Sequence, residues 1–137
     1  MSSSSENARP VVLAADDEQD LLALISFSLE RKGYEVLQAA DGEQALEVIR
    51  ERQPDIAVLD VRMPRMSGIE VLQQIRGEHS LAATPVLLLT AAVQHEDIER
   101  GLSAGANAYM SKPFSPRELV ESVGALLDGS NPSSDGN

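Results

Sequence analysis

Three acidic side chains follow apolar runs of the sequence. Asp60 ends the run 56–60, and Asp16 and Asp17 follow the run 11–15. Near-continuous apolar runs are typical of strands in a parallel sheet covered by helices on both faces, and such sheets bind ligands at the carboxyl ends of their strands. Three carboxylates within about 4 Å of one another repel by roughly 4 kcal/mol per pair at an effective dielectric constant near 20, so they require a cation or a bound proton. The sequence therefore predicts a metal site.

A hydroxyl group and an ammonium group are expected at the same edge of the sheet. A fourth apolar run ends in Thr90, Ala91 and Ala92, and Lys112 follows a fifth. Singly these residues indicate little, because a threonine after a strand is commonly a helix cap or turn residue and a lysine is commonly solvated. Together with the acids they form a set at four strand ends, where chance does not readily place them.

The elements that position this set alternate along the chain. Strands are expected near 11–15, 34–39, 55–60, 85–90 and 107–111, and helices near 18–31, 43–52, 67–76, 95–104 and 116–127. This pattern predicts an α/β fold, a single (βα)5 doubly wound domain of the flavodoxin-like kind. The second run mixes polar and apolar residues and suits an edge strand, whereas the fourth suits the interior, so we expect a parallel sheet of order 2-1-3-4-5.

Composition narrows the class of protein. The chain has 137 residues, no cysteine and a formal net charge of -11. That charge opposes direct binding to nucleic acid or to anionic lipid, and no apolar stretch approaches the roughly 20 residues of a membrane span. We expect one domain over residues 10–128, flanked by flexible tails at 1–9 and 129–137, in a cytoplasmic protein. The second tail is equally consistent with the start of a linker in a longer protein.

With these motifs in place, residues 10–127 resemble the receiver domain of two-component response regulators, the CheY-like fold. The resemblance lies in Asp16-Asp17, in the segment 60–68, in Thr90-Ala91 and in the segment 105–114. It implies that Asp60 accepts a phosphoryl group from a phosphohistidine on a sensor histidine kinase or a histidine phosphotransfer protein. The protein would then not be an enzyme in the ordinary sense, although it would assist its own phosphorylation and dephosphorylation.

The resemblance also implies a role for each site residue. Asp16, Asp17, Asp60 and the backbone carbonyl of Arg62 would bind Mg²⁺, a hard cation that prefers oxygen ligands. Thr90, Ala91 and Lys112 would adjoin the phosphoryl oxygens. A cis peptide bond before Pro113 would turn Lys112 inward.

The expected output is a change of surface. In the resemblance, Thr90 and Tyr109 form a switch pair that alters the face made by the fourth helix, the fifth strand and the fifth helix, and this face would control a downstream output protein or domain. A tyrosine is also an ordinary strand residue. A phosphorylation-dependent homodimer stays open.

Four residues carry further hypotheses. Arg62 could cover the phosphoryl group or point into solvent, and Ala92 has no side chain to orient a water, which suggests slow self-dephosphorylation. Phe27 is either a filler under a neighbouring loop or an exposed docking residue for the phosphodonor. Gly68 is expected to be structural, in a turn beside the helix N-cap Ser67.

Other functions remain in competition. A Mg²⁺-dependent phosphatase of the haloacid dehalogenase kind also uses a strand-end aspartate, but it usually carries an acid where this chain has Arg62. A degenerate receiver would lack part of the Asp16, Asp17, Asp60, Thr90 and Lys112 set. Nucleotide binding is disfavoured because no Gly-x-x-x-x-Gly-Lys loop follows a strand.

Overall fold

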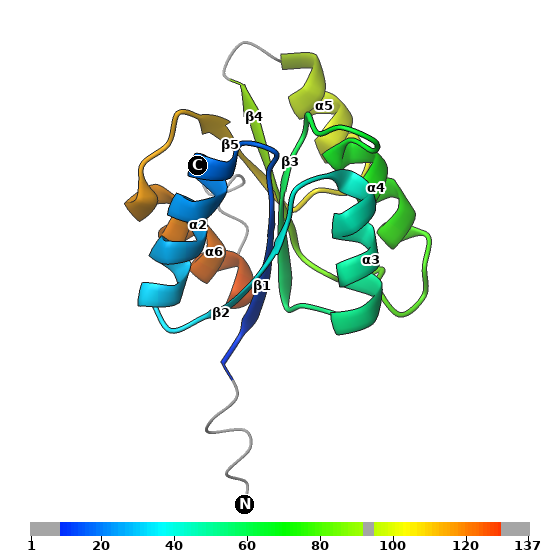
Figure 1. Cartoon of the computed structure of the whole chain (residues 1–137). Coiled ribbons are helices and arrows are strands. Elements are labelled where there is room, and N and C mark those ends of the chain that lie inside the picture. The colour runs from blue at the N-terminus through cyan, green and yellow to red at the C-terminus, as the bar shows by residue number, and fades with distance from the viewer. Residues whose placement is uncertain (1–8, 92–94, 130–137) are drawn as a thin grey trace, which may run out of the picture.

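A computed structural model describes residues 9–91 and 95–129. A central parallel sheet is covered by helices on both faces (Figure 1). The elements in chain order are β1 Val11–Ala15, α2 Gln19–Arg31, β2 Glu35–Ala39, α3 Gly42–Arg52, β3 Ile56–Asp60, α4 Gly68–Arg76, β4 Val86–Ala91, α5 His95–Ser103, β5 Ala108–Lys112 and α6 Pro116–Leu127. Except for residues 9 and 129, the predicted tails lie outside the described residues.

The strand order is β2-β1-β3-β4-β5, with every neighbouring pair parallel, which confirms the predicted topology. All five residues of β3 are buried, as are the first five of β4, whereas β2 at the edge is mostly half-buried. This is the difference expected between interior and edge strands.

Each face of the sheet has its own hydrophobic core. One core joins the sheet to α3 and α4, and the other joins it to α2 and α6, which lie on the opposite side in Figure 1. Each strand alternates its side chains between these two cores, because successive residues of a strand point to opposite faces. Leu13 and Leu59 belong to the first core, for example, and Ala14 and Val58 to the second.

Tyr34 and Lys112 lie in other elements than the sequence predicted. Tyr34 was expected in the second strand, but its N–H donates to the carbonyl of Leu29 at 3.2 Å and so closes the turn after α2. Lys112 was expected after the fifth strand and is instead the last residue of β5, where it pairs in register with Ala91. The strand therefore carries the lysine to the carboxyl edge directly.

The loop between β3 and α4 packs tightly against its neighbours. A Cβ on Gly42 would lie 1.8 Å from the carbonyl oxygen of Met66, and one on Gly68 would lie 2.4 Å from that of Asp60. Ser67 caps α4 through a capping box with Glu70. Gly68 is thus the first residue of the helix, where only a residue without a side chain allows this approach to Asp60.

Among the described residues, no helix combines the length and apolar character needed to cross a membrane.

Candidate functional site

The three predicted acids meet at the carboxyl edge of the sheet. Asp16 directly follows β1 and Asp60 ends β3, and these strands are neighbours. Asp16 is fully buried, Asp60 is 6% exposed and Asp17 is exposed. One carboxylate oxygen from each of the three residues lies within 4.8 Å of the others. Two strands distant in sequence therefore place three hard oxygen ligands in one small volume.

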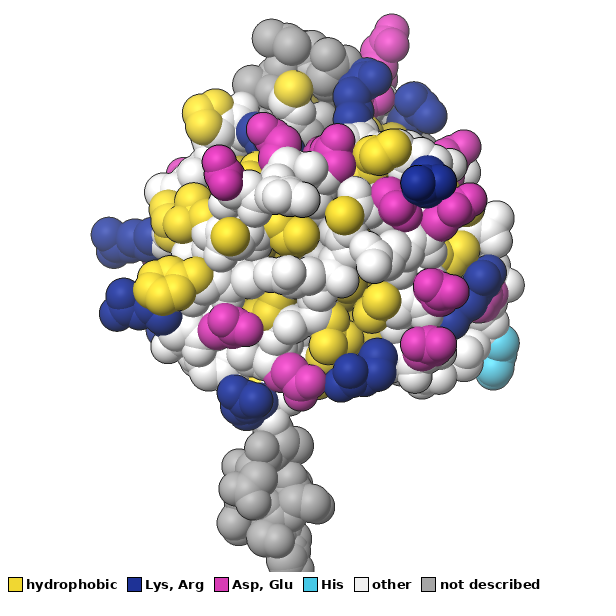
Figure 2. Space-filling model, in the orientation of Figure 1, with side chains coloured by type: hydrophobic (Ala, Val, Ile, Leu, Met, Phe, Trp, Pro, Cys, Tyr) yellow, Lys and Arg dark blue, Asp and Glu magenta, His cyan; other side chains and the backbone are white. Residues whose placement is uncertain are grey.

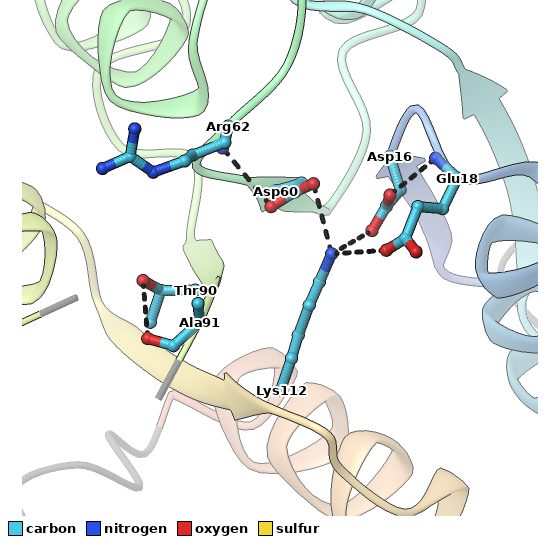
Figure 3. Close-up of polar contacts among 7 residues, drawn as sticks. All are labelled: Asp16, Glu18, Asp60, Arg62, Thr90, Ala91 and Lys112. Atoms are coloured by element: carbon cyan, nitrogen blue, oxygen red, sulfur yellow. Dashed lines mark hydrogen bonds and ion pairs between the residues drawn. The ribbon is translucent and has the colours of Figure 1, made fainter. Parts of the chain in front are cut away.

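The ammonium group of Lys112 lies among these acids (Figure 3). Its Nζ is 3.0 Å from Oδ2 of Asp16 and 3.2 Å from Oδ2 of Asp60. It also lies 3.2 Å from Oε1 of Glu18, a contact that was not predicted from the sequence. The signal was present, since Glu18 continues the acidic run after β1, and its N–H donates to Oδ1 of Asp16 at 2.9 Å.

Burial and charge shift the protonation of both central groups. Burial raises the pKa of Asp60 to about 6, and the charge of Asp16 adds to this, while the Lys112 ammonium and the N–H of Arg62 oppose it. Partial burial by itself would lower the pKa of Lys112, but the close contact with the Asp16 carboxylate and the charges of Asp60 and Asp16 outweigh it and raise that pKa. The lysine therefore stays charged at neutral pH and neutralises part of the acidic cluster.

The donor set fits a divalent cation with a preference for oxygen. Oδ2 of Asp16 is buried and receives no hydrogen bond of good geometry among the described residues, although Lys112 lies beside it. Desolvation of a carboxylate oxygen is costly unless a cation compensates for it. The residues available are carboxylates, with no cysteine in the chain, so they suit Mg²⁺ rather than a metal that prefers sulfur.

The remaining site residues come from β4 and β5. Thr90 is 2% exposed, and its hydroxyl donates weakly to the carbonyl of Ala91 at 3.4 Å. Tyr109 lies on the neighbouring strand and is 37% exposed. The peptide bond between Lys112 and Pro113 is cis, the isomer that the resemblance implied.

Arg62 has a contact that neither hypothesis about it included. Its backbone N–H donates to Oδ1 of Asp60 at 3.3 Å, but its guanidinium group points away from Asp60 in Figure 3. There Nη2 lies 2.9 Å from Oδ2 of Asp97, a buried residue of α5. Asp97 was not predicted as a site residue, because an acid in the first turn of a helix is ordinarily explained by the helix dipole.

The structure describes Phe27 but not Ala92, so it tests only the hypothesis about Phe27. Phe27 is 58% exposed, which rules out the interpretation as a filler, and the guanidinium carbon of Arg31 lies 5.8 Å from the centroid of its ring. Ala92 lies outside the described residues, so slow self-dephosphorylation stays a prediction.

Comparison with known proteins gives consistent matches. The model of the response regulator receiver domain matches residues 12–124. The chain is 45% identical over 116 residues to the alkaline phosphatase synthesis transcriptional regulatory protein PhoP of Bacillus subtilis, covering 85% of this chain and 48% of that protein. It is 39% identical over 121 residues to the phosphate regulon transcriptional regulatory protein PhoB of Pseudomonas aeruginosa, covering 88% and 53%. The chain thus spans about half the length of these curated relatives.

Solved structures agree with the fold. The chemotaxis response regulator CheY4 of Vibrio cholerae aligns with a TM-score of 0.82 at 34% identity, covering 87% of this chain and 99% of that one. A CheY-like receiver domain protein from Methanospirillum hungatei JF-1 aligns with a TM-score of 0.83 at 30% identity, covering 89% and 96%.

Proposed function

The chain belongs to the response regulator receiver domain family, and from that premise we propose that it is a phosphoacceptor switch in which Asp60 takes a phosphoryl group. The observation that carries the proposal is the position of Asp60: a buried carboxylate, 3.2 Å from the Lys112 ammonium and beside two further acids. The family is that of receiver domains and not of haloacid dehalogenase phosphatases.

In the proposed transfer, an oxygen of Asp60 forms a bond to phosphorus while the bond from phosphorus to the donor's imidazole nitrogen breaks and its electron pair returns to that ring. Transfer of this kind depends on alignment and on neutralising charge at the phosphoryl oxygens. Lys112 would contribute a positive charge from β5, and the hydroxyl of Thr90 would donate a hydrogen bond from β4.

Asp16, Asp17, Asp60 and the carbonyl of Arg62 would hold Mg²⁺. When bound, the ion would supply further positive charge to the phosphoryl oxygens. The buried Oδ2 of Asp16, which has no hydrogen-bond partner among the described residues although Lys112 lies beside it, would gain a further compensating charge from the cation.

The proposed phosphodonor is a sensor histidine kinase or a histidine phosphotransfer protein. A groove of ≈ 640 Å³ runs beside Lys112 between the start of α2 and the segment after β5, and its apolar lining includes Leu21, Leu24 and Phe114. Figure 2 shows hydrophobic side chains reaching the surface on the side where α2 lies, near Lys and Arg side chains. These features suit a partner that presents an amphipathic helix.

The proposed output follows from the neighbouring strands β4 and β5. Phosphate on Asp60 would draw the Thr90 hydroxyl toward it, and the exposed side chain of Tyr109 would turn into the space this leaves. That shift would change the surface of α5, β5 and α6 toward an output protein or domain, in the cytoplasm. Transcriptional control, named for the relatives above, is one such output, and a phosphorylation-dependent homodimer is another consequence to examine.

Phosphorylation is tested directly with acetyl phosphate and Mg²⁺, followed by intact mass spectrometry. We expect one alkali-labile phosphoryl group on the wild-type chain and none on Asp60→Asn. Asp55→Asn is the matched control, because Asp55 directly precedes β3 at the opposite edge of the sheet and should leave the modification unchanged. A chain that stays unmodified, or an Asp60→Asn chain that still takes the label, contradicts the proposal.

Docking is tested by comparing two donors. Phe27→Ala should slow phosphoryl transfer from a phosphorylated histidine phosphotransfer domain and leave the reaction with acetyl phosphate unchanged, because only the protein donor contacts α2. Leu102→Ala, a similarly exposed apolar residue on α5, is the control. Equal rates for Phe27→Ala and wild type with the protein donor would remove Phe27 from the docking surface.

A further inference from the structure

The helix α5 has an unusual buried face. Its two buried residues are Asp97 and Gly101, whereas α4 buries Ile69, Val71, Leu72 and Ile75. A Cβ on Gly101 would lie 2.2 Å from Cδ1 of Leu88, so the helix backbone rests closely on β4. Surface helices are normally held by an apolar stripe. The attachment of α5 therefore depends more on its polar contacts than that of α4 does.

The main polar contact is made by the Asp97 carboxylate, which is 3% exposed. Its Oδ2 lies 2.9 Å from Nη2 of Arg62, an ion pair without the geometry of a hydrogen bond, and its Oδ1 lies 3.3 Å from Nη1 of Arg100. A buried carboxylate needs such partners, because an unpaired charge in the interior is costly. Arg100 belongs to α5 itself, so Arg62 is the cation that links this carboxylate to the loop between β3 and α4.

Arg62 contacts both the phosphoacceptor and α5. Its backbone N–H donates to Asp60, while its side chain reaches Asp97. The side chain is 67% exposed, so it can change rotamer with little loss of packing. A phosphoryl group carries about -1.5 to -2 charges and presents oxygens that a guanidinium group binds well. If Arg62 leaves, Arg100 still accompanies the Asp97 carboxylate.

On the basis of the proposed phosphorylation of Asp60, we propose that Asp97 is a positioning residue that holds the Arg62 guanidinium group away from Asp60. The phosphoryl group draws Arg62 off Asp97 and thereby releases the first turn of α5 from the loop between β3 and α4. This exchange of partners gives α5 a route to sense phosphate that does not pass through Thr90 and Tyr109.

Amide hydrogen exchange of α5, with and without acetyl phosphate and Mg²⁺, tests the release. In the wild-type chain, phosphorylation should speed exchange in His95–Ser103 about fivefold or more, the lower range of allosteric coupling. Asp97→Asn should exchange at the faster rate before phosphorylation and change little after it. Glu99→Gln, which removes a charge from an exposed position of the same helix, should behave as wild type does.

The lifetime of the phosphoaspartate provides a second measurement that a merely structural role would not move. In the wild type Asp97 and the phosphoryl group compete for the Arg62 guanidinium group, so in Asp97→Asn this group should cover the phosphoryl oxygens more of the time and the half-life should lengthen, by up to about fivefold. Arg62→Met combined with Asp97→Asn should abolish that gain. This comparison holds even if Asp97→Asn loosens α5, because both variants lack the same carboxylate.

The outcomes separate the two proposals. A wild-type chain that takes the phosphoryl group while exchange of α5 stays unchanged would overturn the partner exchange and leave the proposed function intact. So would equal phosphoaspartate half-lives in the wild type and Asp97→Asn. A chain that takes no phosphoryl group refutes the proposed function, and the partner exchange falls with it.

Discussion

Replacing Asp60 with asparagine should stabilise the metal-free protein at neutral pH. Burial and the charge of Asp16 raise the pKa of Asp60 to about 6 despite the attraction of Lys112. The ionised form of Asp60 is therefore less stable in the folded protein than in the unfolded chain. Asparagine keeps the shape of the side chain and removes the charge, so it relieves that penalty.

The size and sign of the effect follow from the shift. The ordinary pKa is 3.8 and the folded value is about 6, and each unit corresponds to about 1.4 kcal/mol. Full conversion gives about 3 kcal/mol, and solvent screening at this edge of the sheet reduces our expectation to about 2 kcal/mol. Because the folded pKa is the higher one, stability from Asp60 is full below about pH 4 and is lost as the pH rises through about 6.

The assay is urea unfolding of both chains in EDTA at several pH values. The Asp60→Asn chain should exceed the wild type by about 2 kcal/mol at pH 7.5, or about 7 °C in melting temperature for a domain of this size. The difference should shrink toward zero near pH 4. Addition of Mg²⁺ should stabilise the wild type more than Asp60→Asn, because the variant lacks one carboxylate ligand.

Two results would refute this reasoning. A metal-free Asp60→Asn chain no more stable than the wild type at pH 7.5 would mean that Lys112 fully compensates for burial of the carboxylate. A stability gain that persists unchanged at pH 4 would mean that the effect does not come from the charge of Asp60. Asp55→Asn, outside the acidic cluster, is the control for general effects of removing a negative charge.

Two further substitutions test how the loop and the base of the sheet are held. Gly42→Ala should destabilise the fold by about 2 kcal/mol and weaken Mg²⁺ binding, because its Cβ displaces the Met66 carbonyl. Gly77→Ala is the control and should have little effect, since the nearest atom would lie 3.6 Å from its Cβ. Urea unfolding measures the stability of both variants, and titration measures their Mg²⁺ binding. Arg76→Met should lower the free energy of unfolding by about 2 kcal/mol, since the Arg76 guanidinium group donates to the carbonyls of residues 82, 84 and 105. Arg50→Met removes only an exposed ion pair and should lower the free energy of unfolding far less. Stability unchanged by Gly42→Ala or Arg76→Met would contradict these accounts.

The fold was largely predictable because its strands have distinctive hydrophobic patterns in the sequence. The runs at β3 and β4 are almost wholly apolar, and the mixed run at β2 identifies an edge, which together indicate the strand order. Acids at the ends of β1 and β3 then had to be neighbours, since parallel strands present their carboxyl ends at one edge. Fold and ligand proximity thus follow from periodicity and topology.

What could not be predicted depends on how individual side chains meet in three dimensions. Arg62 and Asp97 lie far apart in the chain, and nothing in the periodicity of α5 indicates that Asp97 is buried whereas the other acids of this helix are exposed. The contact between Glu18 and Lys112 depends on the rotamer of an exposed glutamate side chain. The contact of Gly42 with the loop before α4 depends on a backbone distance that no residue pattern encodes.

The arrangement of the acids on β1 and β3 has a consequence for folding kinetics. The two strands are adjacent in the sheet, but β2 and two helices separate them along the chain, so the ligand set is complete only after a long loop has closed. Before β1 and β3 pair, only the acidic residues after β1 are available to bind a cation, and Asp60 is not yet beside them. An ion that binds the finished set should therefore mainly slow unfolding, and should speed folding only to the extent that β1 and β3 are already paired in the transition state.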